Sequence, residues 1–215
     1  MQKLVLATSN QGKLAELKPL LAEFDYALVT QGELGVDDAV EDGRSFIENA
    51  IIKARHASAA TGLPALADDS GLVVPALGGE PGIHSARYAG THGDSAANIA
   101  KLLDAMRSLP DNQRAAHFTC VLVLLRHADD PEPLVAEGRW FGQVLLSPRG
   151  GKGFGYDPVF LPDGETRTFG EMMSAEKHAW VPGQLTAAEL DAATKNQASH
   201  RGQAIVRLRA LLARA

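Results

Sequence analysis

Two aspartates stand side by side in the apolar run ALADDSGLVV, at Asp68 and Asp69. Burying a carboxylate costs on the order of several kcal/mol of free energy unless it is paired with a cation or bound to a metal. With Glu41 they form a set of hard oxygen ligands that suits Mg²⁺, and one carboxylate left partly free would serve as a base on a metal-organised water. The alternative is a turn with an Asx cap, which explains only one of the two aspartates.

The stretch TSNQGK follows a short apolar segment and precedes a helical pattern. Exposed backbone N–H groups at such a helix start, together with Ser9, Asn10 and Lys13, would make a cradle for phosphate. The stretch lacks the spacing of a Walker A loop. The alternative is a polar turn with a helix cap.

Two further stretches carry groups suited to a planar ligand. In GGKGFGYD the glycines allow close backbone approach, Phe154 and Tyr156 offer stacking surfaces, and Asp157 accepts hydrogen bonds. In SHR, His200 and Arg201 would donate to a carbonyl, a base edge or a phosphate. The alternatives are a flexible hairpin loop for the first stretch and a helix start capped by Ser199 for the second.

Charge, composition and hydropathy argue against several classes of protein. The net charge of −5 argues against a general nucleic-acid binder. The seven histidines and the single cysteine, Cys120, show no metal-ligand spacing, and Cys120 is expected to be a buried strand residue. No apolar run is long enough for a membrane span and no signal-peptide pattern is present, so a cytoplasmic protein without a membrane partner is expected.

The elements that must position these residues alternate between strand and helix. Residues 3–7 and 26–30 are predicted as strands, Leu14 to Phe24 as a helix that Pro19 kinks or shortens, and 31–44 as an acidic loop. A capping box at Ser45 and Glu48 begins a helix that Gly62 and Pro64 end.

A second series of elements follows the aspartate pair. A glycine-rich loop covers 78–90, Asp94 caps a helix, and 117–127 and 134–146 form two long strands. The loop 150–160 leads into another strand, and the tail from Thr186 on is predicted as mostly helical. The fold class is α/β, with a mixed sheet that has an antiparallel part.

The order of these motifs closely resembles the inosine/xanthosine triphosphate pyrophosphatase family, over nearly the whole chain. The resemblance rests on ATSNQGKLAEL, SFIENAIIKA, ADDSGL, GEPGIHSARYAG, GFGYDPVF and SHRGQA. It implies an enzyme that uses Mg²⁺ to hydrolyse non-standard purine nucleoside triphosphates (ITP, dITP, XTP) to the monophosphate and pyrophosphate, and a homodimer. It also implies one domain over 1–215, with a long central mixed sheet, flanking helices and two lobes around a nucleotide-binding cleft.

The resemblance also implies a role for individual residues. Asp69 would be the general base and would bind Mg²⁺ with Glu41, with Asp68 beside them. Ser70 would contact the substrate, and His200 and Arg201 would recognise the base. The triphosphate and the nucleoside would be held by two further sets, Thr8, Ser9, Asn10, Gln11, Gly12 and Lys13 for the first and Phe154, Gly155, Tyr156 and Asp157 for the second.

The chain departs from the family pattern in its tail, where two segments have the layout of the one that carries the family's substrate-contacting lysine. One holds Glu171 and Lys177, and the other holds Glu189 and Lys195. Only Lys195 lies about one helical turn before Ser199, so we expect Lys195 to contact the substrate and 170–188 to be an insertion. Two other functions stay open: a pyrophosphatase for modified pyrimidine triphosphates, and a non-catalytic nucleotide sensor.

Overall fold

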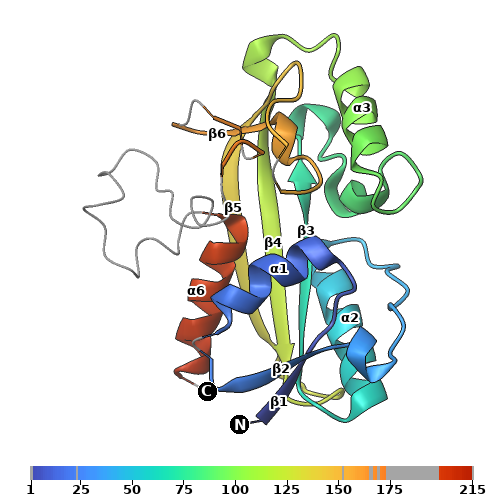
Figure 1. Cartoon of the computed structure of the whole chain (residues 1–215), viewed down its shortest axis with the longest axis vertical. Helices are drawn as coiled ribbons and strands as arrows, with labels where there is room; N and C mark the ends of the chain where they lie inside the picture. Colours follow the sequence, from blue (N-terminus) through green and yellow to red (C-terminus); the bar gives the residue numbers. More distant parts are fainter. Residues whose placement is uncertain are drawn as a thin grey trace. The chain divides into compact units, whose positions relative to one another are not determined.

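The computed structural model describes residues 2–22, 24–151, 153–164, 167–168, 170–172 and 199–214. Its strands form one mixed six-stranded sheet in the order β2-β1-β3-β4-β5-β6, flanked by helices, which confirms the predicted α/β class (Figure 1). The chain divides into two compact units, which are described in turn. The first comprises 1–69, 120–138 and 204–215, and the second comprises 70–119 and 139–203. Their interpretation as two lobes of one domain stays a prediction.

The first unit is built on parallel strands. Strand β1 (Gln2–Leu6) pairs in parallel with β2 (Tyr26–Thr30) on one side and with β3 (Ala65–Val73) on the other. Because parallel neighbours need a crossover, helix α1 (Gln11–Leu20) joins β1 to β2, and α2 (Phe46–Thr61) precedes β3. The carboxyl ends of the paired strands therefore lie at one edge of the sheet, where α/β proteins bind ligands.

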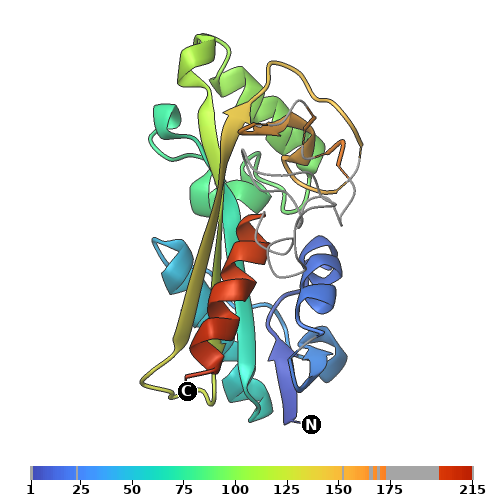
Figure 2. The same ribbon diagram turned by 90° about the vertical axis from the view of Figure 1, so that its left-hand side faces the viewer.

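Alternation along the strands creates two separate cores in this unit. Leu4, Leu6 and Leu66 pack with α1 and α6 (His200–Leu212), whereas Val5, Ala65 and Ala67 pack with α2. Figure 2 shows α1 and α6 on one side of these strands and α2 on the other. Side chains of a strand alternate between faces, so one strand serves both cores. Each face of the sheet is thus covered by different helices. A polar side chain at the end of a strand must therefore face either α1 and α6 or α2.

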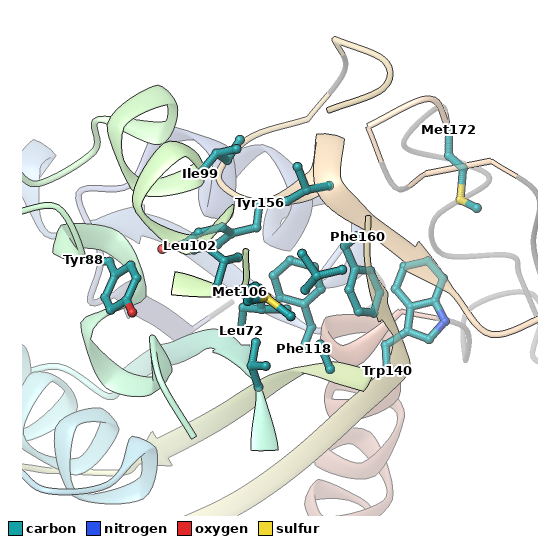
Figure 3. Close-up of a cluster of buried hydrophobic side chains, with 14 residues drawn as sticks. Leu72, Tyr88, Ile99, Leu102, Met106, Phe118, Trp140, Tyr156, Phe160 and Met172 are labelled. Atoms are coloured by element: carbon teal, nitrogen blue, oxygen red, sulfur yellow. The ribbon is translucent and has the colours of Figure 1, made fainter. Parts of the chain in front are cut away.

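The second unit contains the rest of β3, helix α3 (Ser95–Ala105) and the adjoining parts of β4 (Ala115–Leu125) and β5 (Leu134–Val144). The short β6 (Phe160–Pro162) pairs antiparallel with β5, with Val144 opposite Phe160. One aromatic-rich core holds this unit together, and Figure 3 shows Phe118, Phe160 and Trp140 side by side in it. Short 3-10 helices connect these elements, two of which, Gly82–Arg87 and Asp157–Val159, matter for the site.

Most predicted boundaries match the structure. Ser45 caps α2 by accepting from the Glu48 N–H, Gly62 ends it with a φ of 67°, and Asp94 caps α3. Pro19 lies inside α1, one residue before its end. The turn considered for DDSG is wrong, because β3 runs straight through it. The predicted helix from Thr186 lies outside the described residues until α6. Within the described part of the chain, no helix combines the length and apolar character that crossing a membrane requires.

Candidate active site

The predicted phosphate-binding stretch lies where β1 ends and α1 begins. Thr8 Oγ1 accepts from the Asn10 N–H at 3.2 Å, and the Asn10 side chain caps α1 by accepting from the Lys13 N–H at 3.0 Å. Gln11, Gly12 and Lys13 thus form the first helical turn and do not continue the predicted polar turn. The start of a helix leaves backbone N–H groups and a positive dipole end for an anion.

Asp68 and Asp69 lie on opposite faces of β3, because neighbouring residues of a strand alternate. Asp68 shares its face with Leu66 and meets Lys13 of α1, whose Nζ lies 2.7 Å from Oδ1. Its other oxygen, Oδ2, lies 3.2 Å from Sγ of Cys120, a buried strand residue as predicted. Both oxygens of Asp68 therefore have partners within the protein.

Asp69 lies on the face covered by α2 and pairs with Lys53. Nζ of Lys53 lies 2.6 Å from Oδ1 of Asp69 and 3.4 Å from Oε1 of Glu41, so two carboxylates converge on one ammonium. Oδ2 of Asp69 is buried and has no hydrogen-bond partner among the described residues. A buried carboxylate oxygen without a partner is costly, which is typical of a position that a ligand completes.

Burial and charge act against each other in this pair. The pKa of Asp69 is raised because burial disfavours the charged carboxylate, and the attraction of Lys53 and Lys13 offsets only part of that effect. Burial alone would lower the pKa of Lys53, but the attraction of Asp69 and Glu41 outweighs it and the pKa is raised. Lys53 therefore stays an ammonium, and Asp69 is a stronger proton acceptor than an exposed aspartate.

The two lysines also meet at one backbone atom. Nζ of Lys13 lies 3.2 Å and Nζ of Lys53 lies 3.0 Å from the carbonyl oxygen of Asp68. We expected a divalent ion to neutralise the two aspartates in their apolar run, and that ion stays a prediction. Within the protein, each of the two carboxylates already has a lysine partner, supplied by the helix that covers its face. We call Lys13, Glu41, Lys53, Asp68 and Asp69 the lysine–carboxylate cluster.

The cluster's fit to a metal ion follows from its donors. Among the described residues, no group of three or more His, Cys, Asp or Glu side chains is arranged to hold one. Mg²⁺, however, is commonly held by one or two carboxylates together with water and substrate phosphates. Glu41 and Asp69 already share one cation, and one oxygen of Asp69 has no hydrogen-bond partner within the described ranges. These two residues fit Mg²⁺, whereas Asp68 has both oxygens engaged.

Lys53 is the residue that our sequence reasoning missed. It lies in SFIENAIIKA, within a stripe of small buried residues at Ala50, Ala54 and Ala57. A lysine on the apolar side of an amphipathic helix needs a buried partner of opposite charge. The position of Lys53 beside these alanines was therefore the sequence signal for an ion pair with a buried carboxylate.

The loop that carries Glu41 is fastened at several points. Asn49 accepts from the Gly43 N–H at 2.9 Å, and Ser9 Oγ donates to Asp38 at 2.7 Å. A Cβ on Gly43 would lie 2.6 Å from the Asn49 oxygen, so the close approach requires glycine. Ser9, predicted as a phosphate ligand, thus connects the start of α1 to this acidic loop.

The predicted nucleoside-binding residues Phe154, Gly155, Tyr156 and Asp157 form a loop of the second unit, here called the nucleoside loop. Tyr156 is buried in the aromatic-rich core, and its hydroxyl donates to the Ser85 carbonyl at 3.0 Å (Figure 3). Asp157 is buried too and accepts from the Phe154 N–H at 3.1 Å. The buried side chains of Tyr156 and Asp157 therefore stabilise the conformation of the loop. Half-buried Phe154 is the aromatic residue of the loop that can stack on a base.

The SHR motif begins α6. Ser199 Oγ accepts from the Gly202 N–H at 3.0 Å, which gives this residue the capping role considered for it. The His200 ring stacks on Phe118 with 4.9 Å between centroids, and Arg201 Nη2 donates to Ser70 Oγ at 3.0 Å. Both side chains are buried. Arg201 thus contacts Ser70 and follows His200 on α6, and the substrate contacts expected of the three residues stay a prediction. Lys195 and Lys177 lie outside the described residues.

At the carboxyl end of parallel strands, the site combines a helix start, two largely buried lysines and a carboxylate oxygen without a partner in the described part of the chain. This combination is typical of enzymes that act on phosphorylated substrates. The model of the Ham1 family matches residues 4–181, and the chain belongs to this family. The family resemblance inferred from the motifs is thereby confirmed.

Several relatives cover nearly all of the chain. A protein of Xanthomonas campestris pv. campestris (strain 8004) named dITP/XTP pyrophosphatase is 56% identical over 208 residues, which are 97% of this chain and 96% of the relative. One of Vibrio cholerae with the same name is 52% identical over 97% of this chain and 95% of its own length. The solved structure of a HAM1 protein from Coxiella burnetii has a TM-score of 0.81 and 44% identity, with full coverage of both chains. The Staphylococcus aureus Ham1 protein has a TM-score of 0.77 and 36% identity, over 99% of this chain and 98% of the other.

Proposed function

We propose that this chain hydrolyses non-standard purine nucleoside triphosphates, namely dITP, XTP and ITP, to the monophosphate and pyrophosphate. The observation that carries the proposal is the lysine–carboxylate cluster beside the start of α1. It holds two largely buried ammonium groups and a carboxylate oxygen that has no partner among the described residues. Relatives more than half identical are named for dITP and XTP, which supports this substrate class.

The cluster supplies the groups that phosphate hydrolysis needs. The backbone N–H groups of the first turn of α1, with Lys13 and Lys53, would neutralise the triphosphate. Asp69 would take a proton from a water molecule, whose oxygen forms a bond to the α-phosphorus while the bond from that phosphorus to the bridging oxygen of the β-phosphate breaks. Pyrophosphate leaves with that bridging oxygen. Little covalent chemistry is required of the protein beyond positioning and charge stabilisation.

Mg²⁺ would be held by Glu41 and Asp69 and would supply charge neutralisation on the leaving pyrophosphate and orientation of the water. Lys53 holds the two carboxylates within reach of one cation. Asp68, which we expected beside the metal, would act by holding Lys13 in place.

Base discrimination would come from Phe154, Ser70, His200 and Arg201. A 6-keto purine offers an acceptor at position 6 and a donor at N1, and adenine reverses both. Buried donors such as Arg201 would be left unpaired by adenine, and sites built in this way discriminate by about 10⁴ or more. The 2′ position of the sugar would matter little. A homodimer, a cytoplasmic location and the absence of a nucleic-acid or membrane partner belong to the same proposal.

The deciding experiment measures pyrophosphate release from dITP, XTP, ITP, ATP and a modified pyrimidine triphosphate, each with Mg²⁺ and with a chelator. We expect Mg²⁺-dependent turnover of the first three. Preference for the pyrimidine substrate would favour the related house-cleaning enzyme. Binding of dITP without release of pyrophosphate would favour a nucleotide sensor. A kcat/KM for ATP within about tenfold of that for ITP would contradict the proposed base recognition.

A further inference from the structure

Ser85 lies in the stretch GEPGIHSARYAG, a motif to which neither the sequence reasoning nor the proposed function gives a role. It belongs to the 3-10 helix Gly82–Arg87 of the second unit and is 8% exposed. Its hydroxyl accepts from the Leu72 N–H at 2.9 Å and donates to the Gly82 carbonyl at 2.6 Å. Both hydrogen-bonding functions of this buried hydroxyl are therefore used on backbone groups.

The contact with β3 is close enough to determine a neighbouring residue. A Cβ on Gly71 would lie 2.4 Å from Ser85 Oγ and 2.5 Å from the Gly82 carbonyl oxygen. Only glycine leaves room for this approach. Ser85 therefore fixes β3 at Gly71 and Leu72, directly after Ser70, which receives the Arg201 hydrogen bond.

The backbone of the same residue holds the nucleoside loop. The Ser85 carbonyl accepts from the Tyr156 hydroxyl at 3.0 Å, and the tyrosine ring is packed in the aromatic-rich core. Burial raises the pKa of Tyr156, with a further contribution from Tyr88, so its hydroxyl stays a proton donor across the working pH range. Ser85 is thus joined on one side to the strand that carries Ser70 and on the other to the loop that carries Phe154.

We propose that Ser85 is a positioning residue for nucleoside recognition, which fixes the strand segment after Ser70 and the nucleoside loop relative to each other within the second unit. The inference rests on the proposed function. The Ser85 hydroxyl bonds to backbone groups of the second unit, whereas the lysine–carboxylate cluster lies in the first. Loss of this hydroxyl should therefore weaken substrate binding more than it slows the chemical step.

The experiment compares Ser85→Ala with Ser58→Ala. Ser58 is the matched control because it is also buried and its hydroxyl also donates to a backbone carbonyl, that of Leu63, in the first unit. For Ser85→Ala we expect the KM for XTP and for dITP to rise about tenfold while kcat changes less than about threefold. Ser58→Ala should lower Tm to a similar extent and leave KM unchanged.

A second pair of variants tests the hydrogen bond between Ser85 and the nucleoside loop. These variants test the proposed role of Ser85 even if Ser85→Ala does not fold. Tyr156→Phe removes only the hydroxyl that reaches Ser85, and Tyr88→Phe is its control because the Tyr88 hydroxyl donates to Glu80 instead. We expect a higher KM for Tyr156→Phe and an unchanged KM for Tyr88→Phe.

Three outcomes count against the inference. A purely structural role would lower Tm for both Ser85→Ala and Ser58→Ala with the same KM. An unchanged KM in Tyr156→Phe would remove the connection to the nucleoside loop. Absence of turnover by the unmodified protein would overturn the proposed function itself, and this inference with it, whereas an active unmodified protein with unaffected variants overturns the inference alone.

Discussion

Lys13 and Lys53 donate to the same backbone oxygen, although their helices cover opposite faces of the sheet. Their Nζ atoms lie 3.2 and 3.0 Å from the carbonyl of Asp68. The contact is possible because β1 ends at Leu6, so β3 has no β1 partner beside Asp68. The two ammonium groups therefore lie where the pairing of β1 with β3 stops, at the carboxyl end of the parallel strands. Their positive charge makes this edge of the sheet suitable for a polyanion.

Asp69→Asn and Asp68→Asn should have different effects, because the two side chains lie on opposite faces. Asp69→Asn removes the proposed base and is expected to lower kcat by about 10²–10⁴, with the fold and nucleotide binding kept. Asp68→Asn weakens the hold on Lys13 and is expected to lower Tm and raise KM, with kcat reduced less than about tenfold. Steady-state kinetics with dITP and thermal unfolding measure both. Near-normal kcat in Asp69→Asn would refute the assignment of the base.

Lys53→Met should remove the cation that Glu41 and Asp69 share while it preserves the length of the side chain. We expect kcat to fall by about 10²–10³, as for loss of one group that stabilises transition-state charge. Stability should fall too, because Asp69 loses its buried partner. The control is Arg55→Met, an exposed position on the same helix, which should alter neither. If the two variants behaved alike in kinetics, Lys53 would have no role in the reaction.

Asp130 is expected to make the stability of the first unit depend on acid pH. Arg126 binds it through two side-chain hydrogen bonds of 2.8 Å, and this pairing holds the pKa of Asp130 well below its usual range. A lowered pKa in the folded state contributes stability above the unfolded pKa, about 3.9 for aspartate, that disappears as pH falls through the folded pKa. Asp130→Asn should therefore be less stable than the unmodified protein at pH 7, with a gap that narrows below about pH 4.

Chemical denaturation at several pH values would measure that gap. Asp129→Asn is the comparison, since this neighbouring aspartate forms no ion pair with another residue that the structure describes and should change stability little at any pH. A gap for Asp130→Asn that stayed constant from pH 7 to pH 3 would show that the ion pair is not its cause.

Lys195→Ala and Lys177→Ala test the prediction about the tail. The family model matches up to residue 181, a range that includes Lys177 and not Lys195, whereas the spacing to Ser199 favours Lys195. We expect kcat/KM with ITP to fall strongly for Lys195→Ala and little for Lys177→Ala. The reverse order would mean that Lys177 is the substrate-contacting residue and that the insertion follows it.

The sequence alone determined much of the local structure. Ser45 with Glu48, Gly62 and Asp94 mark helix ends, and the structure uses each of them in that way. These signals are dependable because a cap is made by residues within about four positions of one another, so few distant atoms influence it. The order of the motifs also sufficed to indicate the family, since six stretches in sequence are far more specific than any one of them.

Tertiary structure decided which charged groups meet. Asp68 and Asp69 are adjacent in sequence, yet strand alternation sends one to Lys13, 55 positions away, and the other to Lys53, 16 positions away. The same holds for Tyr156, which looked like a stacking residue beside glycines but is buried against a core that residues from 72 to 172 assemble. The sequence gives the residue types, and their spacing along the chain predicts their local conformation. It does not say which helix covers which face of a sheet, and that arrangement is what assigns each carboxylate its lysine.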